Sequence, residues 1–482
     1  MKSYPILFLF LPLLLGACRQ SAPDIEVSVW SSSTSPLTEN YDGVVVPPNI
    51  APLTFYMDDG EGVILSTENC HLSAIAQNGA AIPELETWRT LLADAVGQDI
   101  RVVHCRKSGE EWEAYQPFAL HVATEPIDSF LTYRLIPPGY EKWFDMSIRQ
   151  RNLTNFEETV IAANSESGRN CMNCHAFCAQ DANRMTMHLR GKNGGTVIAR
   201  DGQVRHFDPR QLTGGTNFVY PYWHPSGRYI AYSTNDTKQL FHTHNPNRIE
   251  VMDLKSDVVV YDCQTEQVLK GPELADSLYF ETFPCFSPDG KWLWFCRAPR
   301  PEQMPDDYKQ VRYSLCRMAF DPSSGTFTGG VETVIDADRA GYSVSVPRIS
   351  PDGKHLLYTY SQYGQFLIWH QDADLGMLDL DTADAAASGT GRPLTAVNSS
   401  DADSYHTWSS NSRWIVFSSR RDDGLYTRPY IAYIAADGTA SKPFCLPQST
   451  GDYYDALMYS YNVPELTRNA VRYKVLTTVS AE

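Results

Sequence analysis

The sequence predicts a mainly β protein: a β-propeller of about six blades, preceded by a small antiparallel β-rich domain. Three observations lead to this prediction. One hairpin motif recurs along the second half of the chain, further strand-like runs follow each copy, and residues 41–150 carry strand-like runs without the motif. About four short strands in a long repeat are typical of a propeller blade and favour this fold over a β-sandwich.

The recurring motif is a β-hairpin, and its turn is clearest in "SPDG", residues 287–290. Pro288 pre-sets the second turn position, and Gly290 suits the left-handed one. Aromatic and β-branched residues flank each turn, as strands prefer. The apolar position before the turn recurs about every 60 residues, at Trp223, Phe286, Ile349 and Trp408.

A degenerate copy of the motif opens the series when Phe177 is set against Trp223. This register predicts a propeller over residues 169–482. A sixth blade would be completed by the C-terminal segment or by a strand from elsewhere in the chain.

The N-terminus reads as a targeting segment, because Lys2 precedes an apolar run too short for a comfortable membrane span. The run ends in "LGAC", which resembles a bacterial lipobox. The resemblance implies a lipoprotein signal peptide over residues 1–17 and a lipid anchor on Cys18. A plain secretory signal with a chance cysteine is the alternative. The Ser- and Pro-rich residues 18–40 predict a tether.

The expected location is the cell envelope, with the lipid in the outer membrane and the protein facing the periplasm. Arg19 follows Cys18, whereas the best-known rule for retention in the inner membrane requires an aspartate there.

Residues 41–150 predict a small antiparallel β-rich domain, for which an Ig-like module is one candidate architecture. It would contain one helix over residues 82–97, with Pro83 early and Gly97 just past its end. Residues 151–168 predict a linking helix, since Thr154 and Glu157 have the spacing of a capping box.

The formal net charge is −17, and no basic run is present, which argues against a nucleic-acid partner. An acidic surface favours solubility and would steer a basic protein partner. No nucleophile elbow, phosphate loop or paired catalytic carboxylates are evident, so we expect an electron carrier or binding protein rather than an enzyme. His370 is a candidate for the axial channel, although surface polarity explains it more simply.

The chemical motif is Cys-x-x-Cys-His at residues 171–175. This pattern predicts one covalent haem c, with thioethers from Cys171 and Cys174 and with His175 as the proximal ligand of the iron. A disulfide or free-thiol role and a metal cage are the alternatives. Zinc normally needs a second ligand pair, and Cys178 alone would leave an irregular cage.

The sixth iron ligand is less defined by the sequence. Met187 is the first candidate for the distal position and His188 the alternative, and an open or solvent-ligated iron is a third outcome. Met185, Met187 and Leu189 also alternate as the residues on the buried face of a strand do. Packing in a core is therefore the alternative explanation for a methionine at position 187.

The hairpins of residues 165–482 closely resemble those of the TolB-like (WD40-like, PD40) propeller family, and the cysteine segment resembles proteins that fuse a haem site to such a propeller. "CAQDAN" departs from that pattern by an insertion and the lack of a glycine. The resemblance implies an envelope lipoprotein that carries haem for electron transfer or docks a redox partner. The alternative is a non-redox, protein-binding scaffold.

Overall fold

The computed structural model describes residues 25–37, 41–137, 145–192, 194–380 and 391–476. The predicted signal peptide and the lipid-anchor residue Cys18 lie outside these ranges. Within them, no helix is both long and apolar enough to span a bilayer.

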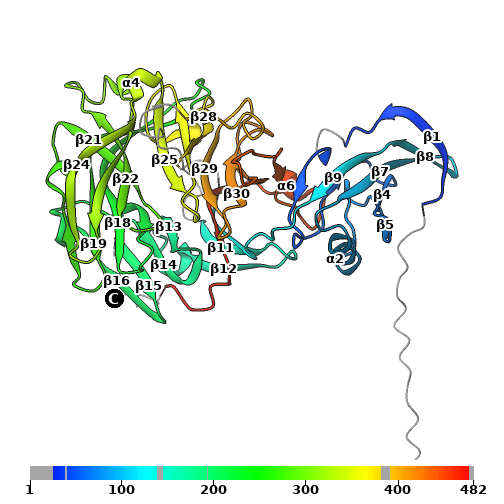
Figure 1. The fold of residues 1–482 in the computed structure, drawn as a ribbon, viewed down its shortest axis with the longest axis horizontal. Coiled ribbons are helices and arrows are strands. Elements are labelled where there is room, and N and C mark those ends of the chain that lie inside the picture. Colours follow the sequence, from blue (N-terminus) through cyan, green and yellow to red (C-terminus); the bar gives the residue numbers. More distant parts are fainter. Residues whose placement is uncertain (1–24, 38–40, 138–144, 193, 381–390, 477–482) are drawn as a thin grey trace, which may run out of the picture.

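The larger part of the molecule is a ring of four-stranded antiparallel sheets, which we number 1 to 6 by their first strands β13, β17, β21, β25, β29 and β33. Each first strand contacts the next, and β33 contacts β13, so the ring closes on itself. Figure 1 shows these sheets on the left, around a common centre. The fold is therefore a β-propeller, as predicted.

The strands of sheets 1 to 3 are β13 (Met172–Cys178), β14 (Asp181–Leu189), β15 (Gly195–Arg200), β16 (Gln203–Phe207), β17 (Val219–Trp223), β18 (Tyr229–Phe241), β19 (Ile249–Asp262), β20 (Gln267–Leu269), β21 (Tyr279–Phe286), β22 (Trp292–Pro299), β23 (Ser314–Asp321) and β24 (Thr326–Ile335). Those of sheets 4 to 6 are β25 (Ser343–Ile349), β26 (His355–Ser361), β27 (Asp374–Asp379), β28 (Arg392–Pro393), β29 (Asp403–Trp408), β30 (Trp414–Ser419), β31 (Arg428–Tyr433), β32 (Phe444–Cys445), β33 (Ser460–Thr467), β10 (Phe130–Ile136), β11 (Ser147–Asn152) and β12 (Glu158–Ala163).

A β-bulge interrupts all six first strands at the same place. The bulged residue has a positive φ between 47° and 55° in every sheet, and its pairing with the second strand breaks there. The bulged residues are Cys174, Tyr220, Phe283, Val346, Tyr405 and Val463. Proline follows in four sheets, where the broken ladder needs no amide donor. Histidine follows in the other two, at His175 and His406.

This repeat confirms the register in which Phe177 was set against Trp223, since each stands three residues after its bulge. The Cys-x-x-Cys-His motif therefore lies on the first strand of sheet 1. His175 occupies the position that proline holds in most of the ring.

Sheet 6 closes the ring with strands from both ends of the propeller. Its order is β12-β11-β10-β33, so three strands come from residues 130–163 and one from residues 460–467. The predicted linking helix over residues 151–168 is wrong. A turn leads into β12, and only η1 (Asn164–Ser167) is helical, because β-branched residues of this segment pair with β11.

The N-terminal part is built on one seven-stranded sheet with a helix on it (Figure 1). Two strand pairs in it are parallel, β1 with β8 and β2 with β9, so the prediction of an antiparallel β-rich domain is wrong for these pairs, while the pairs of β4, β5, β7, β8 and β9 with one another are antiparallel. The elements are β1 (Val27–Thr34), β2 (Val45–Val46), β4 (Gly62–Ser66), β5 (His71–Ile75), β7 (Asp99–Ser108), β8 (Glu111–Gln116), β9 (Phe118–Val122), the pair β3 (Phe55–Tyr56) and β6 (Ala80–Ala81), and α2 (Leu85–Asp94).

The predicted tether over residues 18–40 is also wrong in its second half. Residues 27–34 form β1, which is ordered by pairing with β8 although its composition is polar. The predicted helix over residues 82–97 is confirmed in its central part as α2.

The N-terminal part and the ring share one hydrophobic core. It joins Trp88 and Val102 of the first to Trp414 and Val416 of sheet 5. Polar contacts follow the same boundary: the indole of Trp414 donates to a backbone carbonyl of the N-terminal part at 2.9 Å. The two parts are therefore packed together through a continuous core. The remaining short helices are α3 (Arg210–Thr213), α4 (Ala337–Ala340), α6 (Tyr453–Ala456), η2 (Pro272–Leu274), η3 (Tyr308–Gln310) and η4 (Leu367–Trp369).

Candidate functional site at the two ends of the channel

The bulge divides the centre of the ring into two cavities. Residues that follow it on all six first strands line one cavity of about 200 Å³, which we call the Glu465 mouth. Residues that precede it on the first strands of sheets 1, 2 and 6 line a second cavity of about 270 Å³, which we call the Arg134 cavity. The two cavities thus lie at opposite ends of the channel.

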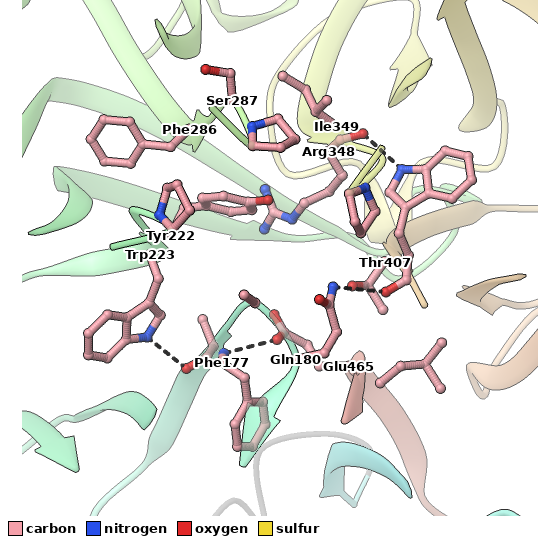
Figure 2. A pocket seen from close by; sticks show the side chains of 17 residues that line it. Phe177, Gln180, Tyr222, Trp223, Phe286, Ser287, Arg348, Ile349, Thr407 and Glu465 are labelled. Atoms are coloured by element: carbon pink, nitrogen blue, oxygen red, sulfur yellow. Dashed lines mark hydrogen bonds between the residues drawn. The ribbon is translucent and has the colours of Figure 1, made fainter. Parts of the chain in front are cut away.

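The Glu465 mouth has apolar walls around a few polar groups (Figure 2). Trp223 and Trp408 stand in its wall, and their indole N–H groups donate to backbone carbonyls of the neighbouring sheets at 3.2 and 3.0 Å. Prolines of the hairpin turns add to the rim. Apolar walls with convergent polar groups are typical of binding sites.

Glu465 is the buried acid of this mouth. Burial raises its pKa to about 7, while Arg348 and the amide of Phe177 act in the opposite direction. That amide donates to the carboxylate at 3.1 Å. The Arg348 guanidinium lies 5.1 Å from the centre of the Tyr222 ring. The carboxyl group therefore changes its protonation near neutral pH.

The Arg134 cavity receives the first cysteine of the motif. Cys171, Asn173 and Arg190 of sheet 1 line it together with Arg134 of β10 and residues of sheet 2. Cys171 is partly exposed, and no disulfide joins it to Cys174: both are free thiols.

Cys174 and His175 point in different directions. Cys174 is buried at the channel, near Tyr220 and Tyr405 of sheets 2 and 5; burial raises the pKa of both tyrosines, and Cys174 adds to the effect. His175 is wedged toward sheet 6, near the backbone of Thr132 and Val463. Adjacent residues of an extended strand project to opposite sides, and the bulge does not remove this divergence.

His175 is 1% exposed, and neither ring nitrogen makes a hydrogen bond of ordinary geometry among the described residues, although backbone groups of Thr132 and Val463 lie close to the ring. Burial lowers its pKa to about 3, helped by the charge of Arg134. His406, at the equivalent position of sheet 5, also has a pKa lowered to about 3 by burial. The environment of His175 is therefore partly a property of its place in the ring.

A haem bonded to both thiols and ligated by His175 needs all three groups on one side of the strand. In this conformation they do not fit one porphyrin, because Cys174 faces the channel while His175 faces sheet 6. The unpartnered nitrogens of His175 are what a missing ligand would explain, so haem attachment stays a prediction that requires β13 to move.

The two candidate distal ligands lie on opposite faces of β14. Met187 belongs to the apolar cluster between sheets 1 and 6, on the His175 side. His188 follows it and faces the other way, as does Thr186, which bonds Tyr232 of sheet 2. Burial lowers the pKa of His188 to about 3. Of the two, only Met187 shares a side with His175.

His370 lines neither cavity. Its Nε2 lies 2.9 Å from Glu250 and its Nδ1 lies 3.1 Å from the Ser361 hydroxyl, an order of groups seen in hydrolases. The hydroxyl, however, donates to Asp372 at 3.0 Å, and Ser361 is 2% exposed. The network therefore ties a loop of sheet 4 to β19. Among the described residues, no cluster of three or more His, Cys, Asp or Glu side chains has a metal-binding arrangement.

Sequence reasoning missed Glu465, Arg348 and Arg134. Arg348 and Glu465 each stand two residues after a bulge, where the ring faces its channel, so alignment of the six repeats is the signal that would have found them. Arg134 carries no such signal, because it lies on a second strand that the motif does not mark.

The fold and the two cavities place this chain in the class of β-propeller proteins. Its sequence matches no protein-family model and no curated protein. Similar solved structures include a prolyl endopeptidase (13% identity, 65% of this chain and 42% of that chain, TM-score 0.36). Others are prolyl oligopeptidase B from Galerina marginata (11%, 72% and 42%, TM-score 0.35) and a GH43 endo-arabinanase from Bacillus licheniformis (13%, 54% and 93%, TM-score 0.31). The match spans about two fifths of the peptidases, and nothing of these enzymes' activity is transferred at such scores.

Proposed function

We propose that this chain is a non-redox binding protein of the cell envelope, a six-bladed propeller that holds a short, largely apolar segment of a partner protein in the Glu465 mouth. The supporting observation is the mouth itself. All six first strands contribute to it, and its aromatic and proline walls surround the few polar groups that would orient a bound segment.

The shared core supports a platform role. Because the N-terminal part packs into the core of sheets 5 and 6, it would be held in place against the ring, so that little ordering entropy would be lost when a partner docks. The net charge of −17 would speed the approach of a basic partner. Envelope location rests on the lipobox resemblance at Cys18.

The haem protein remains the second candidate, because both ring nitrogens of His175 are buried without a hydrogen bond of ordinary geometry among the described residues and Cys171 lines a cavity. It would require β13 to leave its place in sheet 1. Bound haem would supply one-electron chemistry; the thiols and the imidazole would hold it.

One preparation tests both candidates. The full chain is produced in bacteria that mature c-type cytochromes, and its absorption spectrum and intact mass are measured. We expect no Soret band and no haem adduct. A haem-stained denatured band that is lost in the Cys171→Ala/Cys174→Ala variant would replace the proposal with the haem alternative.

Partner binding is tested by cross-linking in the envelope. Thr407 lines the mouth, so Thr407→Trp fills it, while Thr265→Trp adds the same side chain to an exposed turn of sheet 2. We expect one defined envelope protein to be captured by the wild type and by Thr265→Trp, but not by Thr407→Trp. Equal capture by all three, or by none, would refute the proposal.

A further inference from the structure

Arg134 is a buried cation for which the described residues supply no counter-ion. Its residue is 8% exposed, and it lines the Arg134 cavity. One guanidinium nitrogen donates to the carbonyl of Met172 at 3.3 Å, and Nε is buried with no partner. No carboxylate of the described residues pairs with it. A buried charge is costly unless a partner or ligand compensates it.

The lining of the cavity has the charge that an anion requires. Its described lining residues include no Asp or Glu, although the whole chain carries 57 acidic against 40 basic residues. Arg190, an exposed second cation, stands at the same cavity. The charged side chains among the described lining residues are therefore both cationic, within an acidic protein.

Neutral groups complete the cavity. Asn235 and Asn462 line it, and each has a buried side-chain oxygen without a partner. The amide nitrogen of Asn235 donates to Asp253 at 2.8 Å, which fixes the orientation of this side chain. Phe241, Phe366 and other apolar side chains form the rest of the wall.

We infer that the Arg134 cavity binds a small organic anion. Its carboxylate or phosphate group would meet the guanidinium of Arg134, whose fork of N–H donors can bond two oxygens of either group. Hydroxyl or amine donors of the ligand would reach the unpartnered oxygens of Asn235 and Asn462, and an apolar part would contact the aromatic wall. The site lies at the opposite end of the channel from the Glu465 mouth and does not depend on the proposed function.

The test measures thermal unfolding of the purified full chain with benzoate and with inorganic phosphate, against sodium chloride at equal ionic strength. We expect at least one probe to raise Tm saturably below about 10 mM. Arg134→Met should weaken that binding about tenfold or more, because a charge-assisted contact is lost. Arg134→Lys keeps the charge without the planar group and should bind with intermediate affinity.

Arg317→Met is the matched control, since Arg317 lies on β23 outside the cavity, and it should bind as the wild type does. Without ligand, Arg134→Met should be at least as stable as the wild type, because an uncompensated buried charge has been removed. The inference is overturned if neither probe raises Tm more than chloride does. Wild-type affinity in Arg134→Met and Arg134→Lys would also overturn it. A response to benzoate alone would identify the ligand as a carboxylate, and a response to phosphate alone as a phosphate.

Discussion

Replacing His175 by proline tests whether this residue is a structural member of the ring. Proline stands at the equivalent position of four sheets, after a residue with the same positive φ. The ladder is already broken there, so loss of the amide costs little. We therefore expect His175→Pro to stay within about 1.5 kcal/mol of the wild-type free energy of unfolding at pH 7.

The pH dependence of this variant follows from the lowered pKa. Folded His175 has a pKa of about 3, and an unfolded histidine has one of about 6.5. Between these values only the unfolded chain takes up the proton, so the wild type loses stability as pH falls. From pH 7 to pH 5 the loss integrates to about 2 kcal/mol. The variant lacks it and should gain that amount relative to the wild type.

Urea unfolding at pH 7 and pH 5 measures the difference. Other buried groups act in the same direction, as His188 does, or in the opposite one, as does Glu281, whose pKa is raised to about 8 by burial. They are common to both proteins, so their contributions cancel. His406→Pro is the matched control and should show the same shift, because its pKa is lowered to the same value. A stability difference that does not change with pH would refute the reasoning, as would a loss above about 4 kcal/mol at pH 7.

Three further outcomes are expected. Between pH 5 and pH 9 the free energy of unfolding of Glu465→Gln should rise by about 2.5 kcal/mol relative to that of the wild type. The pKa of folded Glu465 is raised to about 7, so the wild type loses stability as the pH rises through this value. Thermal unfolding at both pH values measures the difference. Trp414→Ala should cost about 3–5 kcal/mol and lower the unfolding midpoint of both parts together in calorimetry, because Trp414 is fully buried in their shared core; two separate transitions would contradict this. Gly290→Ala should lower Tm more than Gly353→Ala, although both have a positive φ near 75°, because an added Cβ would lie 2.2 Å from His224 in the first and meets nothing within 4 Å in the second; equal losses would show that backbone strain alone decides the cost.

The repeated part of the fold could be predicted because its signals are local. Each hairpin combines turn residues and flanking strands within a few positions, so a turn such as "SPDG" is enough to locate the hairpin in the sequence. The register of Phe177 followed from the same local pattern, and it placed the cysteine motif correctly on the first strand of sheet 1.

The remaining elements depend on distant partners. The segment of β12 was predicted to be helical because Thr154 and Glu157 have the spacing of a capping box. It forms a strand instead, because it pairs with β11. β1 is polar, and its order comes from β8, more than 75 positions away: the Ser28 hydroxyl donates to Trp112, 84 residues along the chain. The motif at Cys171 showed which residues matter, but spacing alone does not reveal that Cys174 and His175 face different sides.

The closure of sheet 6 sets the order in which the molecule can be completed during synthesis. Gln150 of β11 donates a hydrogen bond to the carbonyl of Val471, 321 residues later in the chain. The pairing partner of β10, strand β33, is separated from it by a similar length of chain and is therefore synthesised much later. Until then β10 presents an unpaired edge of the kind that recruits foreign strands. A nascent or truncated chain that lacks residues 460–467 would leave that edge open, so a chaperone that covers β10 during synthesis would protect the chain from pairing with foreign strands.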